Sequence, residues 1–181
     1  MIAPYINVSK LDVGKRQLET AIKLFLTDAD PISIHTLSAA AQEVFNCLLK
    51  KQGSGVSFIE KSIKEFVEPG KQEEIKKHFA SSKNFFKHAN NDSDGVHKFY
   101  FKLTEWFLWD TCNMYKSLTG ESPELVSVFL IWFYSAHRDV LITDLAKQQL
   151  FDKLLKSFSL TSDNKSKFLE LLPELVVLQN K

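Results

Sequence analysis

The chain has 181 residues, 44% of them hydrophobic and 25% charged, which is the ordinary composition of a globular protein and fits one domain over residues 1–181. Lysine and arginine number 23 and aspartate and glutamate 22, so the net charge of +1 gives no overall field that would draw the chain onto nucleic acid or an anionic membrane. Only two cysteines are present, Cys47 and Cys112, and this number excludes a disulfide scaffold and a cysteine-based zinc site.

No stretch of the sequence indicates a membrane or a secreted location. Residues 1–9 lack the basic start and apolar run of a secretory signal, and the most apolar stretch, residues 125–134, has about half the length that a membrane-spanning helix needs. We therefore expect a cytoplasmic protein with no membrane partner, in which both thiols are reduced.

Apolar residues recur at helical spacing through the first half of the chain. They predict helices over residues 10–27, 31–51, 57–67 and 72–89. Asp30 is the expected N-cap of the second helix and Pro31 its first residue, because proline there loses no needed amide. Pro69 and Gly70 are expected to end the third helix. The short connection between the first two helices predicts an antiparallel pair.

The second half of the chain continues the helical pattern after a polar turn at residues 90–95. Residues 97–103 alternate apolar and polar side chains and are expected to lie extended on the other helices. Further helices are expected over residues 104–117, with Thr104 as N-cap, and over residues 123–134, 143–158 and 162–177. The sequence therefore predicts an all-α, up-and-down helical bundle of about seven or eight helices.

Common metal and phosphate motifs are missing from the sequence. The five histidines form no HExxH pattern and no pair one helical turn apart, and no glycine-rich phosphate loop occurs. We therefore expect no metal and no cofactor.

A polar cluster is expected at the end of the fourth helix, where Lys83 and Lys87, like Asn84 and His88, are neighbours one turn apart. Lysine neutralises a phosphate and histidine transfers protons near neutral pH, so the cluster has the groups needed to hold and cleave a phosphodiester. The alternative is a capping cluster, in which His88 bonds a backbone carbonyl and the lysines complement the helix dipole.

Three further residues are candidates for ligand binding. His35 is interpreted as a buried histidine that bonds a neighbouring helix, or alternatively as a partner of His88 in one site. His137 and Arg138 follow the most apolar helix. They are interpreted as cations at a helix end, or alternatively as an anion site in which Arg138 takes a phosphate. The three tryptophans are expected in the core.

Three segments resemble a family of small bacterial all-helical proteins whose activity is uncharacterised. They are residues 16–22 (RQLETAI), 30–37 (DPISIHTL) and 84–92 (NFFKHANND), the last with the Phe-Phe-Lys-His-Ala motif. The segments make up less than a third of the chain, and the resemblance implies a helical fold without implying an activity.

Lys83, Asn84 and His88 also resemble the ribonuclease motif of the HEPN superfamily of helical bundles. In that motif an arginine and an adjacent polar residue precede a histidine that faces a dimer cleft. Lys83 stands in the place of the arginine, and lysine cannot make a bidentate contact with phosphate. The resemblance implies a HEPN-like bundle, a homodimer, and RNA or a nucleotide as ligand.

Three functions are open at this point. The one that the sequence favours is a non-catalytic binding or regulatory module whose protein partner is not identified. The second is a metal-independent ribonuclease or nucleotide-acting enzyme. In that enzyme His88 is the acid or base, Lys83 and Lys87 hold the phosphate, and Asn84 orients the group. The third is an enzyme or ligand-binding protein with its site elsewhere. Convergence of the four residues on an open cleft would favour the second.

Overall fold

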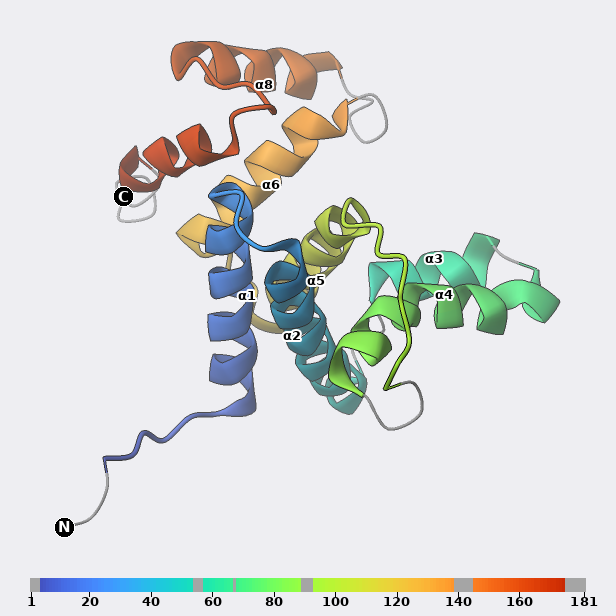
Figure 1. The fold of residues 1–181 in the computed structure, drawn as a ribbon. Coiled ribbons are helices and arrows are strands. Elements are labelled where there is room, and N and C mark those ends of the chain that lie inside the picture. Colours follow the sequence, from blue (N-terminus) through green and yellow to red (C-terminus); the bar gives the residue numbers. More distant parts are fainter. Residues whose placement is uncertain (1–3, 54–56, 67, 89–92, 139–144, 175–181) are drawn as a thin grey trace.

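The computed structural model describes residues 4–53, 57–66, 68–88, 93–138 and 145–174, and these residues form helices and no strand (Figure 1). The helical elements are α1 (Lys10–Leu26), α2 (Pro31–Gln52), α3 (Phe58–Phe66), α4 (Pro69–Lys87), α5 (Leu103–Thr119), α6 (Glu124–Ala136), α8 (Leu145–Ser157) and the 3-10 helix η1 (Lys165–Leu171). The predicted all-α class is confirmed for this part of the chain. None of these helices is both long enough and apolar enough to cross a membrane.

Local signals fix the first two helices. α1 begins with a capping box, in which Ser9 Oγ accepts the Asp12 amide and the Asp12 carboxylate accepts the Ser9 amide, both at 3.0 Å. α2 begins as predicted after Asp30, with Pro31 in its first turn, and ends at Gly53, whose φ of +66° suits glycine. The short turn between the helices makes them antiparallel neighbours (Figure 1).

The core lies where α1, α2, α5 and α6 meet, and η1 closes one side of it. Its fully buried side chains include Leu18, Ile22, Leu26, Phe45, Leu108, Val126, Val128, Phe129, Phe133, Phe168 and Leu171. α1 and α2 approach closely at Gly14, where an added Cβ would lie 2.4 Å from the ring of Phe45. A larger residue at this crossing would therefore force the Phe45 ring to shift.

α3 and α4 run side by side and project from the α2 and α5 side of the core (Figure 1). Residues 95–100 follow without regular structure, as predicted for residues 97–100, whereas residues 101 and 102 of the predicted segment form a turn and Leu103 begins α5. Phe99 of this segment packs edge-on against Phe86 of α4, with ring centroids 5.1 Å apart. The segment is thereby fixed against α4.

Three boundary predictions are wrong. Pro69 and Gly70 begin α4 instead of ending α3, since proline is favoured in the first turn of a helix. Thr104 does not cap α5: the helix begins at Leu103, and the Thr104 side chain is buried. The last predicted helix is a 3-10 helix over Lys165–Leu171. The first part of the predicted turn, residues 90–92, and the end of the last predicted helix, residues 175–177, lie outside the described residues.

Candidate functional site

The four residues of the predicted cluster lie together on α4 but do not converge on one cleft. The ammonium groups of Lys83 and Lys87 lie 3.8 and 3.5 Å from the same carboxylate oxygen of Glu43 in α2. Asn84 and His88 are both exposed. The structure therefore brings the two lysines to one acid, apart from the histidine.

His88 is the C-cap of α4, and its backbone amide donates to the Asn84 carbonyl at 3.1 Å. This contact uses the backbone of His88, whereas the predicted capping contact used its side chain. Neither His88 nor Asn84 lines any of the three hollows described below. The convergence that the ribonuclease interpretation requires is not seen among these residues.

The α1–α2 groove, a hollow of about 390 Å³, runs over one face of α2 between α1 and the C-terminal end of α4. It is lined by Lys10, Gln17, Ala40, Glu43, Val44, Cys47, Leu48, Lys51 and Lys87. Ala40, Val44 and Leu48 follow one another at single helical turns and form its apolar floor. All three are half-buried, so part of this apolar surface is open to solvent.

Lysines from three helices stand around this floor. Lys10 begins α1, Lys51 lies in the last turn of α2, and Lys87 ends α4. Glu43 is the one acidic residue of the lining, and it is shared by Lys87 and Lys83. Ion pairs this exposed contribute about 0–1 kcal/mol, so Lys87 can turn to an incoming anion at little cost.

Gln17 adds a polar group to the wall of the same groove. Its Oε1 atom is buried and accepts no hydrogen bond from the described residues. Buried polar atoms in proteins are nearly always bonded, so this oxygen is available to a donor on a ligand or to water.

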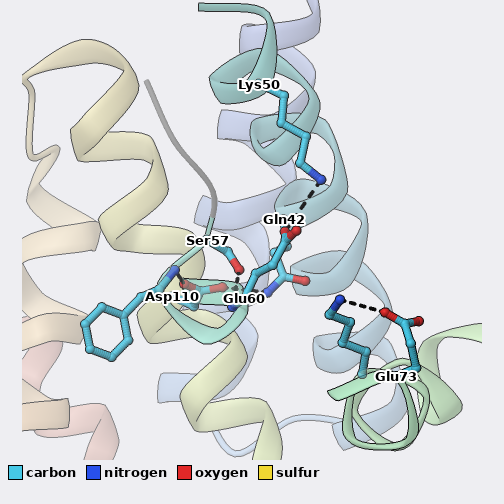
Figure 2. Close-up of polar contacts among 8 residues, drawn as sticks. Gln42, Lys50, Ser57, Glu60, Glu73 and Asp110 are labelled. Carbon is cyan, nitrogen blue, oxygen red and sulfur yellow. Dashed lines mark hydrogen bonds and ion pairs between the residues drawn. The ribbon is translucent and has the colours of Figure 1, made fainter. Parts of the chain in front are cut away.

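A second hollow of about 260 Å³, the α3–α4 groove, meets the first at Glu43, which pairs with Lys83 of the second groove and with Lys87 of the first. It is lined by Gln42, Asn46, Ser57, Ile59, Glu60, Ile63, Lys76, Phe79, Ala80, Lys83 and Phe107. Its charged side chains have partners nearby: Lys76 lies 2.7 Å from Glu73, and Glu60 lies 3.5 Å from Lys50 (Figure 2). With Lys83 paired to Glu43, each charged side chain of this groove has an ion-pair partner elsewhere in the fold.

Asp110 of α5 lies buried close to this second groove and was not among the predicted site residues. Its carboxylate accepts the side-chain amide of Gln42 and the backbone amide of Phe58, both at 2.7 Å (Figure 2). An anion at the start of α3 also suits the positive end of that helix. Burial raises the pKa of the Asp110 carboxyl, although its hydrogen bonds act in the opposite direction. Asp110 thus joins α2, α3 and α5.

His35 is buried in α2, as its first interpretation predicted, and bonds a neighbouring helix. Its Nδ1 atom lies 3.0 Å from Thr104 Oγ1 of α5, and Phe86, Phe99 and Phe107 meet its ring edge-on. Burial, with a smaller contribution from His97, lowers the pKa of His35 to about 4. The ring is therefore neutral at physiological pH, and its buried Nε2 atom has no partner in the described part of the chain.

His137 and Arg138 both pair with acidic residues of other helices. His137 is the C-cap of α6, and its Nε2 atom lies 2.9 Å from Glu105 of α5. Arg138 lies 2.6 Å from Asp152 of α8. An anion bound by Arg138 would have to compete with Asp152, so the geometry indicates a contact between helices.

A third hollow, of about 200 Å³, lies beside the turn that joins α1 to α2. Lys165 of η1 lines it, 2.7 Å from Asp28 and 4.3 Å from the centre of the Phe25 ring. This ammonium group already has an anion and an aromatic face as partners.

The sequence prediction omitted Glu43 and Asp110 for different reasons. Asp110 gives a detectable signal, because it is a single carboxylate inside the apolar run FLWDTC. Glu43 gives none, since its partners Lys83 and Lys87 lie some forty residues later and their approach depends on how α4 packs on α2.

Within the described ranges, no three His, Cys, Asp or Glu side chains come together as ligands of a metal ion would. Comparison of the chain with models of protein families, with curated proteins and with solved structures finds no match.

Proposed function

We propose that the protein is a non-catalytic binding module that holds a segment of another protein in the α1–α2 groove. The observation that carries the proposal is the open apolar floor of Ala40, Val44 and Leu48 between lysines of three helices. Partly exposed apolar surface rimmed by charged residues is typical of protein-interaction sites.

The composition of the groove favours binding over catalysis. Its lining contains neither a histidine nor a pair of carboxylates, the side chains that most often carry acid–base chemistry. Because the groove can hold a partner without changing it chemically, we assign the protein an accessory or regulatory role.

The proposal also covers the type of helical bundle, the location of the protein in the cell and its oligomeric state. An up-and-down bundle of the HEPN-like type is supported by the antiparallel α1 and α2 and by the helical content of the described residues. A cytoplasmic location and a homodimer are the accompanying predictions, and the dimer is tested by the mass of the protein in solution.

A selection from displayed random peptides tests the binding function. We expect wild-type protein to enrich peptides that bind it and do not bind Val44→Glu, because that change places a carboxylate on the groove floor. Ser117→Glu is the matched control, since Ser117 is exposed on α5 and does not line the groove. Failure to enrich any peptide sensitive to Val44→Glu would contradict the proposal.

The ribonuclease interpretation has a separate test. Lys83 and Lys87 contact Glu43, so the geometry gives this function less support than binding. Cleavage of RNA by the purified protein that is lost in His88→Ala would support it. Equal cleavage by both proteins, or cleavage by neither, would end it.

A further inference from the structure

We infer that the occupant of the α1–α2 groove is an acidic, amphipathic α-helix of about three turns, an inference that rests on the proposed function. Three features carry it: the length of the groove, the spacing of its apolar floor and the placement of its lysines.

The groove has the length of a short helix. Its α2 stripe reaches from Ala40 to Lys51, which at about 1.5 Å per residue spans about 16 Å. Three turns of a partner helix cover this distance. An extended peptide would cover it with about five residues and would place alternate side chains away from the floor.

The floor matches the spacing of a helix. On the floor of the groove, the side chains of Ala40, Val44 and Leu48 form a ridge along α2 at intervals of four residues. Two helices pack when such a ridge on one helix fits between the rows of side chains on the other. A partner helix with apolar side chains one turn apart fits this ridge. The small Ala40 leaves the most room, so the bulkiest apolar side chain of the partner belongs there.

The positions of the lysines predict that the partner helix carries acidic residues on both sides of its apolar stripe. Lys10 of α1 and Lys87 of α4 stand on opposite walls, and Lys51 stands at one end of the α2 stripe. An acidic residue of the partner can take Lys87 from Glu43, because Lys83 lies 3.8 Å from the same Glu43 oxygen and can keep it paired. The exchange leaves no carboxylate without a cation.

Two other occupants fit less well. A single-stranded nucleic acid is also anionic, but the groove lining has no aromatic ring on which a base could stack, and it contains Glu43. A second copy of the chain could offer its exposed Tyr5 and Ile6, but residues 4–9 carry no charged side chain to meet the lysines. An acidic protein helix matches both the apolar and the charged surfaces.

The test uses the peptides enriched by the display selection, with binding measured by fluorescence anisotropy. We expect peptides rich in Asp and Glu with apolar residues one helical turn apart. At constant low salt their Kd should rise about tenfold in Lys87→Glu and in Lys51→Glu. For the wild type, Kd should also rise as salt is added, because salt screens the attraction between the lysines and the acidic peptide. Lys51 is exposed, so this variant leaves the packing intact. Lys116→Glu, an exposed lysine of α5 outside the groove, is the matched control and should leave Kd unchanged.

A charge-reversal experiment completes the test. The triple variant Lys10→Glu, Lys51→Glu and Lys87→Glu should lose the acidic peptides and gain affinity for versions in which lysine replaces their Asp and Glu residues. Thermal melting of each variant confirms that it is folded.

Each other result has a defined meaning. Enriched peptides that depend on Val44 but are neutral or basic would overturn the inference and leave the binding function standing. The absence of any groove-dependent peptide would overturn both. Binding of a poly(U) RNA that is lost in Val44→Glu, or a dimer in solution that Val44→Glu dissociates, would overturn the inference in favour of those occupants.

Discussion

The two grooves that meet at Glu43 contain similar residue types but use them differently. In the α3–α4 groove, Lys76 and Glu60 have partners nearby, and close to this groove the buried Asp110 receives hydrogen bonds from two helices. In the α1–α2 groove, three lysines surround an open apolar floor, and Glu43, the one acidic residue of the lining, pairs with Lys87 alone among them. Charges that satisfy one another stabilise the fold, whereas charges beside exposed apolar surface are available to a partner.

The largest expected effect is the loss of Asp110. Asp110→Ala leaves the part-buried Gln42 and Phe58 amides without their acceptor, and we expect the free energy of unfolding to fall by about 2–3 kcal/mol. Urea denaturation measures this loss. Asp110→Asn retains one acceptor and should lose about half as much; equal stability of Asp110→Ala and wild type would show that the carboxylate is not a structural link.

His35 should make stability depend on pH. Because its pKa is about 4 in the folded protein and about 6.5 when unfolded, the unfolded state binds the proton first as pH falls. The stabilisation is complete above about pH 6.5, and about 2 kcal/mol of it should be lost between pH 7 and pH 4.5. Urea denaturation at both pH values measures the free energy of unfolding of wild type and of His35→Phe. The variant has no histidine at this position, so it should lack the loss of about 2 kcal/mol that the wild type shows over this interval. The same pH dependence in both proteins would contradict the lowered pKa of His35 in the folded protein.

Gly14 controls the spacing of α1 and α2, the two helices that give the α1–α2 groove its name. Gly14→Ala places a Cβ against the Phe45 ring, and we expect a loss of about 1–2 kcal/mol despite the better helix propensity of alanine. Combining it with Phe45→Leu should make the two losses less than additive, as a double-mutant cycle would show. Additive losses would mean that the two residues are not in contact.

The smallest effect on stability is expected for Glu43. Glu43→Gln removes two exposed ion pairs and should change the free energy of unfolding by less than about 0.5 kcal/mol. The same change releases Lys87 into the groove, so acidic peptides should bind about threefold more tightly. Glu73→Gln, beside the other groove, is the control and should not alter peptide affinity. Weaker peptide binding in Glu43→Gln would contradict the exchange of Lys87 between Glu43 and the partner.

The elements that could be predicted from sequence are those with local causes. Asp30 and Pro31 specify the start of α2, and the apolar spacing of residues 10–26 specifies α1. Pro69 and Gly70 are ambiguous, because the same pair can follow one helix or open the next. The 3-10 form of Lys165–Leu171 has no distinct periodicity in so short a stretch.

The site was less predictable because its parts come from distant segments. Lys83 and Lys87 were found as polar residues on one helix, but their common partner Glu43 is known only once α4 packs on α2. The groove floor was hidden in the sequence for a similar reason. Val44 and Leu48 belong to the apolar spacing expected of a core, and only the arrangement of α1 and α4 leaves them partly open.

Methyl NMR tests the central claim most directly, because the two grooves carry separate reporters. On titration with an enriched acidic peptide, we predict shifts of the Ala40, Val44 and Leu48 methyl groups, with Ile59 and Ile63 of the α3–α4 groove unchanged. Shifts confined to Ile59 and Ile63, or no shift at saturating peptide, would contradict the assignment of the α1–α2 groove as the binding site.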